Sequence, residues 1–220
     1  MLRERLNQVE ERIHNAVARA GRRRSDITLI AVTKKFPAAV TLEAFALGLR
    51  HFGENYVQEF EGKHAALQNL DGAEFHLIGH LQSNKTRIAA ELFQVIETVD
   101  SEKLARRLDQ VGKSLEVMIE VKLSEEESKA GSATDALPGL IDAILQCSKL
   151  RLTGLMTMPP WSDDPAQTRP YFRKLSALAQ TYGLPKLSMG MSHDLEAAIE
   201  EGATHIRVGT ALFGPRSKMA

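Results

Sequence analysis

Hydrophobic residues change their spacing along the chain in a regular way. From Leu2 to Val17 they recur every three or four positions, with charged residues between them. This period predicts an amphipathic helix over residues 2–20 that stops at Gly21, within a leading segment 1–21. Beyond it, short apolar runs rich in β-branched residues alternate with stretches of helical period. The rest of the chain is therefore predicted to alternate strands and helices.

The alternation predicts about eight strands. They are expected at residues 27–33, 50–53, 73–79, 94–99, 115–121, 150–156, 186–189 and 205–208. Helices are expected between them at residues 38–47, 55–70, 83–92, 101–113, 134–147 and 192–202, with one more that follows the loop 159–165 and ends near residue 183. Ser83 is expected to cap the helix that it opens, and Asp100 or Ser101 the next one.

Strands that alternate with helices pair in parallel, because each strand needs a crossover before the next one begins. About eight such units without a break favour an α/β fold, a single-domain (β/α)8 TIM-type barrel with an extra N-terminal helix. This barrel would span residues 1–220 and leave no room for a second domain. An open, doubly wound sheet is the alternative.

Charge and composition narrow the kind of protein. The chain has 28 Lys and Arg residues against 28 Asp and Glu residues, so its net charge gives no bulk attraction to nucleic acid or to an anionic membrane. Its one cysteine, Cys147, excludes an internal disulfide. The chain lacks both an apolar run of about 18 residues and the apolar core of a signal peptide. We therefore expect a cytoplasmic protein.

The histidines predict no metal site. They are scattered along the chain, and only His76 and His80 are close in sequence. That pair spans a predicted strand–loop junction, where positions four apart do not share a face. The basic triplet 22–24 has no aromatic neighbours and is expected on a solvated surface rather than against nucleic acid.

Functional residues of such a barrel lie at the carboxyl ends of its strands. The first expected strand brings Lys34 to that end. A partly dry pocket lowers the pKa of an amine, and the neutral amine is the form that begins Schiff-base formation with a carbonyl. Lys35 is adjacent and chemically identical, so the residues alone leave both lysines as candidates.

The ends of the last two expected strands have the composition of a phosphate cradle. Gly190 and Gly209 permit close approach of the backbone to an anion, and each precedes an expected helix N-terminus. Ser188, Ser192 and Thr210 add hydroxyl donors. Taken singly, each segment is equally consistent with a turn and a helix cap. Together, at the two expected strand ends, they favour a phosphate site.

Three further polar residues suit a planar ligand beside that phosphate. Arg207 at a strand end is equally consistent with a structural ion pair; aimed at a pyridine nitrogen, it would hold that nitrogen unprotonated, because a guanidinium only donates. His80 would stack on the ring or act as an acid or base, or lie at the pocket edge without a chemical role. Asn55 would bond a phenolic oxygen or cap its own helix. Combined with the candidate amine of Lys34, these residues predict a pocket for pyridoxal 5′-phosphate (PLP).

Several segments of the chain resemble one known family, the pyridoxal phosphate homeostasis proteins. Its members are barrels similar to the cofactor domain of bacterial alanine racemase, which is PLP fold type III. The resemblance covers essentially the whole chain. The segments that carry it are residues 52–59, 78–85, 128–131, 154–156, 187–192 and 207–210.

The resemblance implies a role for each matching residue. Lys34 would carry the Schiff base, and Arg207 would face the ring nitrogen, with Asn55 and His80 beside the ring. The implied phosphate site is made of Ser188, Gly190, Gly209 and Thr210. The implied secondary lysines that take part in cofactor handling are Lys129 and Lys218. Many members have asparagine where this chain has Lys122, which adds a cation near the pocket mouth.

The function implied by the resemblance is non-catalytic. The protein would bind PLP and balance the cellular vitamin B6 pool, with PLP, other B6 vitamers and PLP-dependent apo-enzymes as expected partners and a monomer as the expected state. An amino-acid racemase is the alternative, but its tyrosine base would come from a second domain that this chain lacks. A phosphosugar enzyme of the barrel class is a further alternative.

Overall fold

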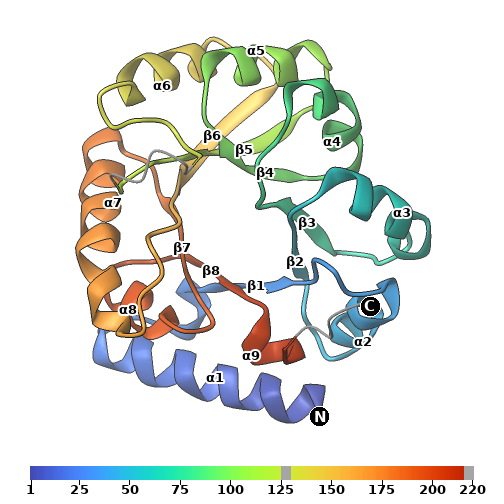
Figure 1. Cartoon of the computed structure of the whole chain (residues 1–220), viewed down its shortest axis with the longest axis vertical. Coiled ribbons are helices and arrows are strands. Elements are labelled where there is room, and N and C mark those ends of the chain that lie inside the picture. Colours follow the sequence, from blue (N-terminus) through green and yellow to red (C-terminus); the bar gives the residue numbers. More distant parts are fainter. Residues whose placement is uncertain (125–129, 216–220) are drawn as a thin grey trace.

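A closed ring of eight parallel strands forms the centre of the computed structural model, which describes residues 1–124 and 130–215 (Figure 1). The strands follow one another around the ring in chain order, and β1 closes it against β8. This topology confirms the predicted barrel and excludes the open sheet. The strands are β1 Thr28–Val32, β2 His51–Glu54, β3 Glu74–Leu77, β4 Val95–Val99, β5 Leu115–Glu120, β6 Leu150–Met156, β7 Lys186–Met191 and β8 His205–Val208.

Helices cover the outside of this ring (Figure 1). They are α1 Leu2–Arg19, α2 Ala38–Ala46, α3 Val57–Leu67, α4 Thr86–Leu92, α5 Glu102–Gln110, α6 Leu137–Leu145, α7 Arg169–Tyr182, α8 Leu195–Glu200 and α9 Thr210–Phe213. Short 3-10 turns occupy Arg24–Asp26, Ser83–Lys85 and Pro165–Thr168. The leading amphipathic helix is confirmed, and it packs against α8 and α9.

Three of the predicted helix starts are wrong, and one of them is the helix predicted from residue 134, which starts at Leu137 as α6. Ser83 opens a 3-10 turn and its hydroxyl does not cap α4; instead, its carbonyl accepts a hydrogen bond from the Thr86 hydroxyl at 3.3 Å. Strand β7 continues to Met191, two residues beyond its predicted end, so α8 starts only at Leu195. By contrast, Ser101 caps α5 as predicted, accepting from the Leu104 amide at 3.4 Å.

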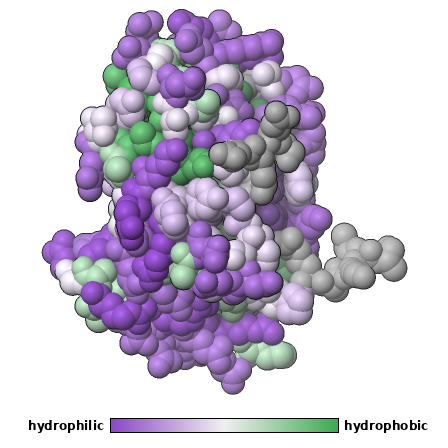
Figure 2. Space-filling model, turned by 60° about the vertical axis from the view of Figure 1, so that its left-hand side comes forward, coloured by the Kyte–Doolittle hydropathy of each residue, from purple (hydrophilic) through white to green (hydrophobic). Residues whose placement is uncertain are grey.

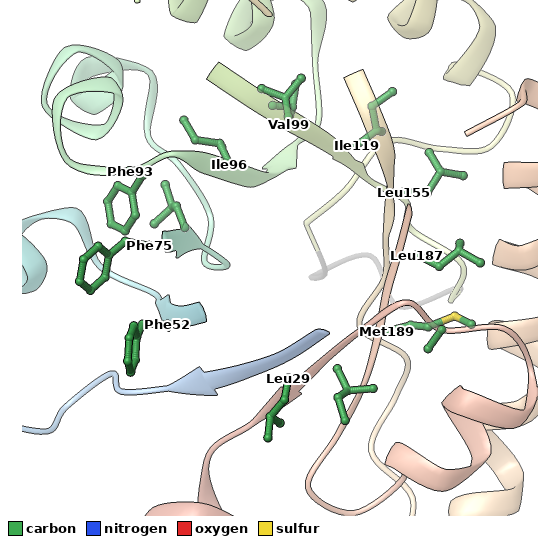
Figure 3. Packing of buried hydrophobic residues seen from close by; sticks show 14 of the residues in the cluster. Leu29, Phe52, Phe75, Phe93, Ile96, Val99, Ile119, Leu155, Leu187 and Met189 are labelled. Atoms are coloured by element: carbon green, nitrogen blue, oxygen red, sulfur yellow. The ribbon is translucent and has the colours of Figure 1, made fainter. Parts of the chain in front are cut away.

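Four phenylalanines tie the strands to the surrounding helices. Phe52 and Phe75 stack on neighbouring strands with ring centroids 5.6 Å apart, and both lie on the helix-facing side of the sheet with Phe93 (Figure 3). Phe60 of α3 inserts between Phe75 and Phe93, at centroid distances of 4.7 and 4.8 Å. Aromatic pairs of this geometry add to the free energy gained from burial. This apolar layer fills the space between the ring and the helices that surround it.

The surface carries few exposed large hydrophobic residues. The face seen in Figure 2 is mainly hydrophilic, with only small hydrophobic areas. Trp161, 70% exposed, and Met158, 37% exposed, are two of the large apolar residues that do reach solvent, and both lie in the loop after β6. Within the described residues, no helix combines the length and apolarity needed to cross a membrane.

Candidate functional site

A pocket of about 450 Å³ lies where the carboxyl ends of the strands meet. This volume is within the range of small-molecule sites, roughly 300–1,000 Å³. Six of the residues that the sequence singled out line it: Lys34, Asn55, Ser192, Arg207, Gly209 and Thr210. They come from the ends of β1, β2, β7 and β8, and therefore from segments far apart in the sequence.

The structure separates the two candidate lysines. Lys34 lies in the turn between β1 and α2, is half-buried and lines the pocket. Lys35 is exposed and has a left-handed backbone conformation, with φ of 63°, and its amide donates to Glu59 Oε1 at 2.5 Å. The turn therefore presents the first lysine to the pocket and the second to solvent.

A buried ion cluster bonds the backbone of this turn. The Lys63 ammonium donates to Glu54 Oε1 at 2.7 Å, to Glu59 Oε1 at 2.8 Å and to the Thr33 carbonyl at 3.2 Å. The Thr33 hydroxyl also donates to Glu54 Oε1, at 2.8 Å. Burial raises the pKa of Glu54, and the Lys63 charge opposes that rise. Because the cluster bonds the backbone next to Lys34, it fixes the position from which the amine enters the pocket.

Asn55 follows β2 and lines the pocket. Its backbone lies close to Gly79, in the loop after β3. A Cβ on Gly79 would lie 2.3 Å from the Asn55 carbonyl oxygen, so only glycine fits there. The Asn55 side-chain oxygen is buried and has no hydrogen-bond partner among the described residues. An unpartnered buried acceptor is costly, so it offers a bonding position to a ligand donor in the pocket.

Backbone N–H groups converge at the end of β8. The Ser192 hydroxyl accepts from the Gly209 amide at 3.3 Å and from the Ala211 amide at 3.2 Å, and all three residues line the pocket. Ser192 therefore caps the start of α9 rather than α8, while Asp194 before α8 accepts from the Met191 amide at 2.7 Å. Such amide groups favour an anion.

Arg207 connects the pocket to a polar network inside the ring. Its side chain is buried and donates to the Ser188 hydroxyl at 2.7 Å and to the Thr157 carbonyl at 2.9 Å. Ser188 in turn donates to Glu97 Oε2 at 2.5 Å, which links β7 to β4 across the interior. Burial lowers the pKa of Arg207, and the charges of Glu97 and Glu120 oppose that change.

Three residues predicted for the site do not line this pocket. The fully buried Ser188 hydroxyl is occupied by its two partners in the interior. Gly190 has φ of 89°, and a Cβ there would lie 2.4 Å from the Ala198 Cβ, so packing of β7 against α8 requires glycine. The His80 side chain is 56% exposed, and its Nδ1 lies 3.5 Å from Asp100 Oδ2.

Two predicted lysines, Lys129 and Lys218, lie outside the described residues. Their proposed part in cofactor handling stays a prediction. Lys122 lies at the end of β5 beside a neighbouring hollow that also contacts Glu120, Met158 and Trp161. The extra cation is thus close to the pocket but does not line it.

One wall of the pocket, formed by the end of β7 and the loops after β6 and β7, was not predicted from the sequence. Met158, Trp161, Met191 and His193 all line the pocket. The Trp161 and His193 rings lie 4.9 Å apart with 32° between their planes. The available signal was position alone, since both loops follow strand carboxyl ends, where barrel sites are found.

Glu120 gives the structure a pH-dependent stability. Burial raises its pKa to about 7, with the Asp100 charge adding to the rise and Arg207 opposing it. The folded chain therefore holds a proton that the unfolded chain releases at lower pH, so stability is lost as pH rises through about 7. We compare the unfolding free energy of Glu120→Gln with that of wild type at two pH values. The difference, variant minus wild type, should be about 2 kcal/mol more positive at pH 8 than at pH 5.

Urea unfolding followed by circular dichroism at both pH values measures this difference. Glu61→Gln, on the exposed face of α3, is the control for loss of a surface carboxyl. Equal shifts for Glu120→Gln at pH 5 and pH 8 would contradict the expected protonation.

The groups around the pocket suit PLP. Lys34 supplies an amine for an aldehyde, and the start of α9 at Gly209, with the Ser192 and Thr210 hydroxyls, suits a phosphate. Arg207 adds a permanent donor, and the unpartnered oxygen of Asn55 adds an acceptor. These groups all line one pocket, so a ligand that carries an aldehyde and a phosphate can contact them together.

Comparison with known proteins identifies the family. The alanine racemase N-terminal domain family matches residues 5–217. The pyridoxal phosphate homeostasis protein of Pseudomonas aeruginosa is 48% identical over 97% of this chain and 95% of its own, and that of Aquifex aeolicus is 42% identical over 97% of each. The structure of PipY from Synechococcus elongatus with PLP bound has a TM-score of 0.83 and 40% identity, covering 97% of this chain and all of PipY. The chain therefore belongs to the family of pyridoxal phosphate homeostasis proteins.

Proposed function

We propose that this chain binds PLP at the carboxyl end of its barrel and serves to balance the vitamin B6 pool without catalysing a reaction. The observation that carries the proposal is the meeting of Lys34, Arg207 and the amides at the end of β8 in one pocket of about 450 Å³. The PLP bound in the PipY structure and the names of the curated relatives support it.

Each pocket residue has a role in this proposal. Lys34 would supply the amine for the cofactor aldehyde, and the start of α9 at Gly209, with the Ser192 and Thr210 hydroxyls, would hold the phosphate. Arg207 faces the ring nitrogen and keeps it unprotonated, because a guanidinium only donates. Asn55 binds beside the ring. This arrangement makes the ring a weak acceptor of electrons, which fits storage of the cofactor better than its use in catalysis.

The absence of an opposed base favours the homeostasis role over racemisation. Among the described residues, no tyrosine lines the pocket: Tyr56 precedes α3 and is 51% exposed, and Tyr171 and Tyr182 lie in α7. The relatives are named homeostasis proteins. Binding of other B6 vitamers, transfer to PLP-dependent apo-enzymes, a monomeric state and a cytoplasmic location stay predictions.

Cofactor titration tests the proposal. The chain should turn yellow with PLP at a ratio of one per chain, and borohydride reduction should leave one labelled peptide. Sugar phosphates added as competitors should displace little of the bound PLP. A colourless chain without a labelled peptide would refute PLP binding. Exchange of an amino acid α-proton in deuterated water, with the loaded chain, would refute the non-catalytic role and favour a racemase.

A further inference from the structure

The opposite end of the barrel holds a second cluster of polar side chains. His51 begins β2 and pairs in register with Glu74, the first residue of β3, and His76 lies two residues further along β3. In a parallel barrel the amino ends of the strands lie at one end and the carboxyl ends at the other. The cluster is thus separate from the proposed PLP pocket, which none of the three residues lines.

Three potential ligand atoms of this cluster form a nearly equilateral triangle. His76 Nε2 lies 3.1 Å from Glu74 Oε1, His51 Nδ1 lies 3.3 Å from the same oxygen, and the two nitrogens are 3.2 Å apart. In a tetrahedral zinc site with bonds of about 2.0–2.1 Å, neighbouring ligand atoms are about 3.3 Å apart. The triangle therefore has the size of one face of such a tetrahedron.

A buried carboxylate holds one imidazole in the orientation that metal binding needs. His76 is fully buried, and its Nδ1 lies 2.8 Å from Glu97 Oε1. With Nδ1 bonded to Glu97, Nε2 is the nitrogen that faces the triangle. A carboxylate behind a ligating histidine is the usual outer partner in zinc sites.

The other two side chains leave the cluster open to solvent. The exposed fractions of the His51 and Glu74 side chains are 36% and 38%. An ion could therefore enter without unfolding, and water could complete its coordination. Two imidazoles and one carboxylate are ligands that zinc-class ions accept.

We propose that His51, Glu74 and His76 form a binding site for one divalent transition-metal ion of the zinc class, joining β2 to β3 at the amino end of the barrel. Because the three residues lie on two adjacent strands, the bound ion cross-links them. The alternative is that the same atoms form only a hydrogen-bonded ion pair and bind no metal. The experiment must distinguish this alternative from the metal site.

Calorimetric titration of the purified chain with Zn²⁺, after removal of metal with a chelator, tests the site. One ion should bind per chain and raise the melting temperature. His51→Gln and Glu74→Gln should each weaken binding at least about 10-fold, since each removes one of three ligands. Both side chains are half-exposed, so these variants should keep the wild-type circular dichroism spectrum, whereas a variant of buried His76 is avoided.

His14→Gln, on the exposed face of α1, is the matched control and should bind Zn²⁺ as wild type does. The proposal is overturned if the wild-type chain shows neither heat nor a shift in melting temperature. It is equally overturned if His51→Gln and Glu74→Gln bind as tightly as wild type, or if His14→Gln is the variant that loses binding. None of these readouts depends on PLP.

Discussion

Replacing Lys34 with alanine should abolish the borohydride-stable attachment of PLP to the chain. The Lys34 side chain lines the pocket at the end of β1, and an amine is required for covalent attachment to an aldehyde. Phosphate and ring contacts from Gly209, Ala211 and Arg207 would remain, so weak reversible binding should persist. Peptide mapping after reduction measures the loss of label, and the absorbance of the loaded chain measures the loss of colour.

Lys35→Ala is the matched control for this experiment. It removes an identical side chain one residue away, where the side chain is exposed and outside the pocket. The control should keep both the label and the colour. Retention of the label in Lys34→Ala, together with its loss in Lys35→Ala, would show that the turn presents the other lysine to the cofactor.

Glu97→Gln should cost about 3 kcal/mol of unfolding free energy, because it removes the charge from a buried network. Glu97 lies in the barrel interior, 2.8 Å from His76 Nδ1 and bonded to Ser188, which itself accepts from Arg207. Glutamine keeps the shape but leaves the buried Arg207 guanidinium without its nearby negative charge. Urea unfolding in the presence of a chelator, which removes any metal contribution, measures the change.

Glu91→Gln makes the same chemical change in a surface ion pair. Glu91 is 53% exposed and lies 3.9 Å from Arg87 on α4, so the control should cost less than about 0.5 kcal/mol. Equal stabilities of the two variants would mean that the interior network contributes no more than a surface pair.

The fold was predictable because it depends on a repeated local pattern. The strand at 150–156 and the strand at 205–208 match their predictions residue for residue, since each is a short apolar run between clear breaks. The errors lie where tertiary contacts decide an end. β7 reaches Met191 because Gly190 lets the strand continue past Ala198, which no local signal in the sequence indicates.

The candidate site was predictable where position along a strand was sufficient. Lys34 and Arg207 follow from their places at strand ends, and both line the pocket. Ser188 and Gly190 were assigned to the ligand because a sequence does not show whether a strand residue faces the interior, the helices or the pocket. In the structure one bonds inside the ring and the other packs against α8.

Cross-strand neighbours were beyond the sequence analysis. His51 and His76 are 25 residues apart and meet only through the register of β2 and β3. The expectation of no metal ion used sequence spacing, which in a parallel sheet carries no information about such pairs. The same reasoning explains the omission of Trp161 and His193, whose rings meet between two loops.

The pairing of β1 with β8 makes cofactor binding a late event in folding. Leu29 of β1 aligns with Ile206 of β8, so the ring closes only when the first strand pairs with the last one. Because Lys34 and Gly209 flank that seam, the two residues line one pocket only after the ring has closed. Folding that joins such distant segments is slow. PLP that binds only the closed ring would stabilise the closed ring by mass action.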